Sequence, residues 1–182
     1  MVVNSDSREA LTPAAVLVPL FRDEENELRI VLVLRGPRGV HGGQLGLPGG
    51  KQEAGDATLL ETALREAEEE IGLPRSEIEV LAELSPVDTR TTGFRIQPYL
   101  ARVRPPPEWR LAQGEIAGVV TPTVTALADP AARREEVFSS PNWPESRRAA
   151  CVELEDGLLL WGLTLRLLDA VVPRLLNGVW AV

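Results

Sequence analysis

Cysteine and histidine are almost absent from this 182-residue chain, which contains one of each, Cys151 and His41. A single cysteine excludes a disulfide within the chain, and a single histidine excludes a zinc site rich in histidine. Redox and zinc chemistry are therefore not expected. Lysine is equally scarce, since Lys51 is the only one.

Positive charge is also in short supply, because 27 Asp and Glu residues outnumber 19 Lys and Arg residues and leave a net charge of −8. Surfaces that track nucleic acid or anionic lipid need clustered Lys and Arg, so neither is expected as a partner. An acidic protein can bind a phosphorylated substrate only with local help from metal ions, backbone N–H groups and a few arginines. If the substrate is a phosphate ester, a metal is expected.

Long apolar runs are missing too: no segment approaches ~20 apolar residues, and Asp6 and Glu9 interrupt the N-terminus, so no membrane span or signal segment is indicated. We therefore expect a cytoplasmic protein.

No linker divides the chain, which predicts one domain over residues 13–182 behind a flexible N-terminus, residues 1–12.

Apolar runs bounded by polar or proline-rich segments predict the strands, and Pro19 in the first run indicates an edge or a bulge. Residues 22–27 are polar and predict a turn that joins the first two strands as a hairpin. The predicted strands are residues 14–21, 28–34, 78–84, 94–103 and 116–120.

The clearest helix is predicted over residues 57–71, where apolar residues recur at helical spacing before Gly72 and Pro74. A terminal helix is predicted from Trp161, with Pro173 kinking or ending it. Residues 123–150 predict a short helix followed by an irregular segment. Together these elements predict an α/β fold with a mixed sheet between helices.

Three carboxylates of the central helix, Glu66, Glu69 and Glu70, fall within an arc of roughly 100° on its polar side. An acidic run alone is typical of a solvated helix face, and like charges at these spacings repel. Oxygen ligands of this kind suit Mg²⁺ or Mn²⁺. Just upstream, Gly49 and Gly50 permit a turn tight enough to bring backbone groups to such a site.

The order Gly50, Asp56, Arg65-Glu66, Glu69-Glu70 and Gly72-Leu73 resembles the Nudix box, in which Gly is followed at fixed spacings by Glu, Arg-Glu, Glu-Glu and Gly. Two departures stand out: the first acid is Asp rather than Glu, and eight residues instead of seven separate it from the arginine. The extra residue lies where the loop enters the helix, so the metal-bearing part keeps its register.

The longer spacing and the upstream segment resemble the coenzyme A (CoA) pyrophosphatase branch of the Nudix family. Matching strings are Val-Leu-Val-Leu-Arg-Gly at residues 31–36, His-Gly-Gly-Gln-Leu-Gly-Leu-Pro-Gly-Gly at residues 41–50 and Thr-Ala-Leu-Arg-Glu-Ala at residues 62–67. Val33, Gly36 and Leu47 stand where the branch has Thr, Ser and Phe, and these differences bear on the substrate rather than on the reaction.

The resemblance implies a Nudix-type α/β/α sandwich and hydrolysis of a pyrophosphate bond. It implies that Glu66, Glu69, Glu70 and the carbonyl of Gly49 bind Mg²⁺ or Mn²⁺, and that Arg65 orients Glu69. The ions would neutralise the diphosphate and activate a water.

Other candidates lie outside the box. Glu115 is a candidate general base or extra ligand, with an ordinary surface glutamate as the alternative. The CoA branch implies that Arg35 or Arg38 receives the 3′-phosphate, because a guanidinium suits phosphate, although each also fits a solvated strand end. His41 and Gln44 are candidates for positioning the substrate.

The leading hypothesis is hydrolysis of CoA or its derivatives to 4′-phosphopantetheine and adenosine 3′,5′-bisphosphate. Alternatives are a Nudix hydrolase of another nucleoside diphosphate derivative, such as ADP-ribose, NADH or a dinucleotide, and a non-catalytic nucleotide-sensing module. An apolar C-terminus around Val179 and Trp180 is compatible with a homodimer, a question that the sequence leaves open.

Overall fold

The computed structural model describes residues 11–37, 42–89, 93–139, 144–154 and 157–182. Two predicted site residues, Arg38 and His41, lie outside these ranges, as does most of the predicted N-terminal segment.

The main sheet is built around two long parallel strands, β1 (Thr12–Arg22) and β8 (Phe94–Val103). Both are mostly apolar and buried, as expected of strands covered on two faces. The antiparallel strands that complete this sheet are β2 (Leu28–Ile30), β5 (Gly49–Lys51), β6 (Ile78–Glu83) and β7 (Val87–Asp88).

A second sheet contains β4 (Leu45–Gly46), β3 (Leu32–Arg35) and β9 (Ile116–Val120). The strand predicted over residues 28–34 is therefore wrong as one element, because it is divided between the two sheets at Val31. The N–H of Val31 donates to the carbonyl of Pro19 at 2.9 Å, outside both ladders. The apolar run of residues 30–34 continues through the division without a break, so the sequence carries no sign of it.

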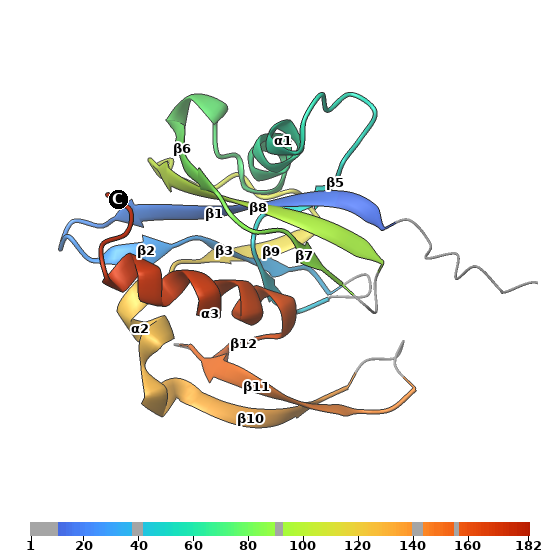
Figure 1. Ribbon diagram of the computed structural model, residues 1–182, viewed down its shortest axis with the longest axis vertical. Helices are drawn as coiled ribbons and strands as arrows, with labels where there is room; N and C mark the ends of the chain where they lie inside the picture. The colour runs from blue at the N-terminus through green and yellow to red at the C-terminus, as the bar shows by residue number, and fades with distance from the viewer. Residues whose placement is uncertain (1–10, 38–41, 90–92, 140–143, 155–156) are drawn as a thin grey trace, which may run out of the picture.

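Helix α1 (Leu59–Ile71) packs on one side of the sheets, and helix α3 (Gly162–Leu176) lies on the other (Figure 1). Each side has its own apolar core: Ala63, Ala67 and Ile71 of α1 contribute to one, and Leu165 and Leu168 of α3 to the other. The predicted α/β class with a mixed sheet between helices is confirmed. Within the described ranges, no helix is long and apolar enough to cross a membrane.

The segment predicted to be irregular is instead a β-hairpin, so that prediction is wrong. After helix α2 (Val124–Ala128), strand β10 (Arg133–Phe138) pairs with β11 (Arg147–Glu153), which pairs with β12 (Leu159–Trp161). The rings of Phe138 and Trp161 stack with centroids 3.9 Å apart. β10 is largely charged and exposed, so hydrophobic alternation could not predict it. Single 3₁₀ turns occupy Arg75–Glu77 and Pro130–Ala132.

Two prolines lie inside regular elements. Pro173 does not end its helix, because α3 continues to Leu176. Pro19 lies on the central strand β1 rather than on an edge, in the gap between the segments paired with β5 and β2. Since no N–H donor is needed in that gap, proline is tolerated there.

Candidate functional site

Local sequence fixes both ends of α1. The Thr58 hydroxyl accepts a hydrogen bond from the Glu61 N–H at 3.2 Å, and the Glu61 carboxylate accepts one from the Ala57 N–H at 2.7 Å. The first contact satisfies an N–H group that the first turn leaves without a partner, and the second joins the residue before the cap to the helix. At the other end Gly72 adopts a left-handed conformation, with φ of 68°, and its N–H donates to the Glu68 carbonyl. The helix between these caps holds the acidic residues in register.

The three helix carboxylates predicted to bind metal differ sharply in exposure. The Glu70 side chain is only 2% exposed, that of Glu66 is 16% exposed, and that of Glu69 is 61% exposed. Burial raises the pKa of Glu66, opposed by the neighbouring Arg65. Burial raises the pKa of Glu70 to about 7, opposed by Arg35 and by the Gly49 N–H. An ionised carboxylate in such surroundings requires compensation by a cation.

The two glycines before the helix allow β5 to approach these carboxylates. The Gly49 N–H donates to Glu70 Oε2 at 3.0 Å. Gly49 has a φ of 153°, and a Cβ there would lie 2.3 Å from the Ala15 carbonyl oxygen. A Cβ at Gly50 would lie 2.3 Å from Glu66 Oε1. Glycine is needed at both positions. A side chain at residue 49 would collide with the backbone of β1, and a side chain at residue 50 would collide with the Glu66 carboxylate.

One oxygen of Glu70 lacks a hydrogen-bond partner. Oε1 is buried and accepts no hydrogen bond, and its ion-pair contact is Arg35 Nη1 at 3.7 Å. A buried acceptor without a partner costs about 1–3 kcal/mol, so such an atom calls for an explanation. This orphaned oxygen fits a cation-binding role. Among the described residues, however, no three His, Cys, Asp or Glu side chains converge as a ready-made metal cage.

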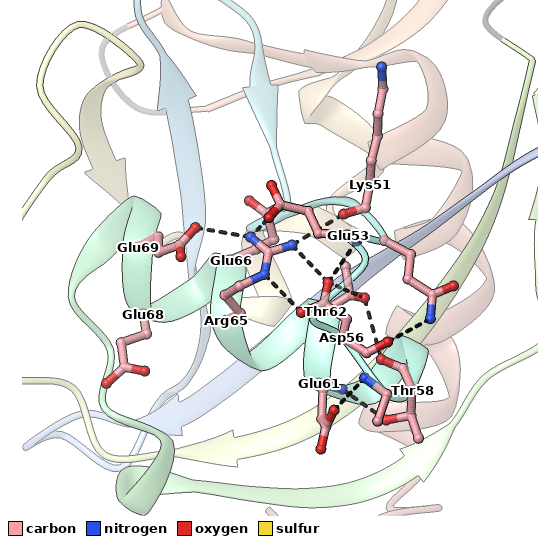
Figure 2. Close-up of polar contacts among 12 residues, drawn as sticks. Lys51, Glu53, Asp56, Thr58, Glu61, Thr62, Arg65, Glu66, Glu68 and Glu69 are labelled. Carbon is pink, nitrogen blue, oxygen red and sulfur yellow. Dashed lines mark hydrogen bonds and ion pairs between the residues drawn. The ribbon is translucent and has the colours of Figure 1, made fainter.

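Arg65 lies at the centre of a polar network that joins the loop to the helix (Figure 2). Its guanidinium donates to both carboxylate oxygens of Asp56, to Glu69 Oε2 at 2.9 Å and to the Lys51 carbonyl at 3.2 Å, and it lies 3.1 Å from Glu66 Oε1. The hydrogen bonds to Arg65 hold the pKa of Asp56 well below its usual range. Arg65 therefore contacts Asp56 and two of the three helix carboxylates predicted to bind metal, Glu66 and Glu69.

Two backbone hydrogen bonds hold the segment that carries Glu115 beside the site. The Gly36 N–H donates to the Glu115 carbonyl at 2.6 Å, and the Ala112 N–H donates to the Glu70 carbonyl at 2.9 Å. The Glu115 side chain is exposed, and its charge contributes to the raised pKa values of Glu66 and Glu70. The structure thus brings the predicted fourth acid near the other carboxylates.

Two of the four residues predicted to contact the substrate, Arg35 and Gln44, lie within the described ranges. Arg35 lies beside Glu70 at the centre of the site. Gln44 is half-buried on the adjoining segment, and its carbonyl accepts a hydrogen bond from the Arg35 N–H at 3.0 Å. The contact between Arg35 and Glu70 joins two chain-distant residues, and nothing in the local sequence around either one indicated it.

The fold and the acid-bearing helix define an α/β protein with a mixed sheet between helices. A family model of the Nudix domain matches residues 11–139, more than half of the chain. The chain therefore belongs to the Nudix family.

Curated relatives include two proteins named uncharacterized Nudix hydrolase NudL. One, from Klebsiella pneumoniae, is 40% identical over 116 residues, which cover 62% of this chain and 59% of the relative. The other, from Salmonella paratyphi B, is 38% identical over 109 residues, which cover 58% and 54%. The chain thus spans less than two thirds of the length of these relatives.

Solved structures share the fold at low identity. A MutT/nudix family protein from Enterococcus faecalis matches with a TM-score of 0.59 at 16% identity, covering 97% of this chain and 65% of that one. The Nudix domain of Shewanella oneidensis NrtR, crystallised with ADP ribose, matches with a TM-score of 0.52 at 18% identity, covering 69% and 81%. At these identities the likeness shows the fold alone.

Proposed function

We propose that this chain is a divalent-metal-dependent hydrolase of the pyrophosphate bond in a nucleoside diphosphate derivative. The observation that carries the proposal is Glu70, a buried carboxylate whose Oε1 accepts no hydrogen bond. Because a buried carboxylate oxygen without a hydrogen-bond partner is costly, a cation at Oε1 would explain why this oxygen is buried.

Glu66, Glu69, Glu70 and the carbonyl of Gly49 would hold Mg²⁺ or Mn²⁺, since hard cations prefer oxygen ligands. In extended backbone the N–H and carbonyl of one residue point toward the same edge of the strand. The Gly49 N–H already faces Glu70, which supports placing its carbonyl on the same side. A bound ion would supply neutralisation of the diphosphate and a more acidic water.

The protein groups have separate tasks in this proposal. Arg65 holds Glu69 and Glu66 in position, since it contacts both while anchored on Asp56. Glu115 accepts the proton of the attacking water or adds a ligand. Its exposed side chain and its electrostatic effect on Glu66 and Glu70 support a place at the open side of the site.

We propose CoA or a derivative as the substrate, giving 4′-phosphopantetheine and adenosine 3′,5′-bisphosphate. The support is the string at residues 41–50, with the box string at residues 62–67, which resembles the CoA pyrophosphatase branch. Arg38, His41 and Gln44 are the candidates for holding the part of CoA beyond the diphosphate.

A different diphosphate is the second candidate. The NrtR domain was crystallised with ADP ribose, and a C. elegans Ap4A hydrolase also shares the fold, both at under 25% identity to this chain. A nucleotide-sensing module is the third candidate, and retention of all three helix carboxylates speaks for the enzyme instead.

A turnover screen of the purified protein with Mg²⁺ or Mn²⁺ tests the proposal. The substrates are CoA, dephospho-CoA, ADP-ribose, NADH and diadenosine polyphosphates. Preference for CoA over dephospho-CoA supports the CoA branch and a 3′-phosphate pocket. Activity on another diphosphate keeps the metal helix and removes the CoA assignment, and binding without turnover favours the sensing module.

A further inference from the structure

Arg35 occupies an unusual place for a residue expected to meet a distant phosphate. Its Nη1 lies 3.7 Å from Glu70 Oε1, close enough for an ion pair but too far for a hydrogen bond. The Arg35 side chain is 30% exposed, whereas that of Glu70 is 2% exposed. Arg35 therefore stands between the buried carboxylate and solvent.

The other arginine of the site is already committed. Arg65 donates to both oxygens of Asp56 and to Glu69. Among the ion pairs of the described residues, Arg35 is the cation paired with Glu70. Within the described ranges, the Arg65 guanidinium is thus held by several hydrogen bonds, and the Arg35 guanidinium has one ion-pair contact that is too long for a hydrogen bond.

The backbone of Arg35 is held while its side chain has room. The Arg35 N–H donates to the Gln44 carbonyl at 3.0 Å, and its carbonyl accepts from the Gly43 N–H at 3.1 Å. The pairing of β3 with β9 shifts register between Leu34 and Arg35, an irregularity that re-aims a side chain. On the neighbouring strand β4, Gly46 pairs with Val33 and has no side chain, and a Cβ there would lie 3.5 Å from Arg35 Nε. A change of partner requires only side-chain rotation.

We propose that Arg35 exchanges partners during the reaction cycle: it balances Glu70 in the metal-free protein and turns to the reacting diphosphate once a divalent cation takes Glu70 Oε1. The proposal rests on the proposed function of this site. It assigns Arg35 to the diphosphate, which every candidate substrate shares, instead of to the 3′-phosphate that only CoA carries. A planar guanidinium can then bind two phosphate oxygens at once.

The exchange follows from competition between two cations for one oxygen. The guanidinium and the metal ion repel each other and both need Glu70 Oε1, so binding of the metal ion weakens the Arg35 contact. Conversely, Arg35 lowers the affinity of the site for metal. Removing its charge leaves Glu70 without a counterion and should tighten metal binding by roughly fivefold to tenfold.

Metal affinity directly tests the first part of the proposal, that Arg35 balances Glu70 in the metal-free protein. Free Mn²⁺ is measured by electron paramagnetic resonance during titration of the native protein and of Arg35→Gln, Arg35→Lys and Arg102→Gln. Arg102 pairs with Glu79 on the surface, so its variant controls for loss of one positive charge. We expect about fivefold tighter Mn²⁺ binding by Arg35→Gln alone, with Arg35→Lys close to native. Unchanged or weaker binding by Arg35→Gln overturns the exchange.

Melting temperatures guard against a folding artefact. In chelator, Arg35→Gln is expected to have a lower melting temperature than the native protein. Saturating Mn²⁺ should raise its melting temperature by more than it raises that of the native protein, because a ligand that binds only the folded state stabilises it according to affinity. An Mn²⁺ shift no larger than that of the native protein contradicts the proposal.

The second part of the proposal, that Arg35 binds the diphosphate, is tested with the Mn²⁺-loaded proteins. Binding of imidodiphosphate, a diphosphate that resists hydrolysis, should weaken about tenfold in Arg35→Gln, and kcat/KM should fall by similar factors for CoA and dephospho-CoA. A loss confined to CoA, or undiminished imidodiphosphate binding, overturns this assignment. If the native protein hydrolyses neither CoA nor dephospho-CoA, the proposed CoA substrate fails, while the Mn²⁺ and imidodiphosphate titrations still decide the role of Arg35.

Discussion

Asp56 receives two hydrogen bonds from the Arg65 guanidinium, from Nε to Oδ1 at 2.9 Å and from Nη2 to Oδ2 at 3.0 Å. The same carboxylate accepts the Thr62 hydroxyl at 2.9 Å and the Glu53 N–H at 3.0 Å. It therefore ties the loop after β5 to the first turns of α1. Despite the extra residue and the shorter acid, this segment still forms a complete two-point contact with Arg65.

Replacing Asp56 by Ala should lower both stability and turnover. Four hydrogen bonds are lost at a side chain that is 5% exposed, which should cost about 2 to 4 kcal/mol. Arg65 would also lose the anchor that aims it at Glu69, so kcat should fall at least about tenfold. Urea unfolding and steady-state kinetics measure the two effects. A stable variant with native kcat would show that Arg65 needs no anchor.

The box residues were largely predictable because their spacing follows helix geometry. Glu66, Glu69 and Glu70 were expected on one polar face, and α1 places Glu66 beside Gly50 and Glu70 beside Gly49. Their unequal burial was not predictable, because it depends on what packs over the helix. Glu70 is covered by β5 and Arg35, two contacts set by tertiary structure.

Replacing Glu70 by Gln should abolish turnover while leaving the fold intact. The amide keeps the size of the side chain and can still accept from the Gly49 N–H, but it cannot neutralise a cation. We expect a loss of about a thousandfold or more in kcat, and no increase in melting temperature on adding Mn²⁺. Glu69→Gln should lose turnover likewise.

Glu68→Gln is the matched control for these variants. Glu68 is on the same helix but pairs with Arg75 and points away from Arg65 (Figure 2). It should keep native kinetics. If Glu70→Gln shows near-native rates, the metal assignment is wrong.

Stability of the metal-free protein should depend on pH through Glu70. Its pKa is raised from 4.5 to about 7 in the folded state, chiefly by burial. The folded state therefore binds more protons than the unfolded state between these values, so stability falls as pH rises from about 4.5 to 7. Melting temperatures in chelator should show this decline, and Glu70→Gln should flatten it. A native profile without such a decline contradicts an elevated pKa.

Gly50→Ala should damage the site more than the fold. The added Cβ would meet Glu66 Oε1 at 2.3 Å, and a side-chain carboxylate can rotate away where backbone cannot. We expect kcat to drop about tenfold to a hundredfold with a nearly native melting temperature. Gly49→Ala should instead lower the melting temperature, because its Cβ meets the Ala15 backbone. Gly55→Ala, with no atom within 4 Å of the new Cβ, is the control.

The parts of the fold that sequence reasoning missed share a physical cause. β10 carries four charged residues in a row, Arg133 to Glu136, and is held by pairing with β11 and by the Phe138 and Trp161 stack. Arg35 at the end of β3 meets Glu70 of α1, although the two residues lie far apart in the chain. Local pattern cannot reveal either feature, because both depend on distant partners.

Pro173→Ala should stabilise the protein, because α3 passes through this proline without ending. A proline inside a helix removes one backbone hydrogen bond and crowds the carbonyl four residues earlier, that of Asp169. The side chain of Pro173 is exposed, so alanine leaves no cavity. We expect a gain of about 1 to 3 kcal/mol in unfolding free energy, measured by urea denaturation, with unchanged kinetics. A loss of stability would mean that the proline ring packs productively or that restriction of the unfolded chain outweighs the restored hydrogen bond.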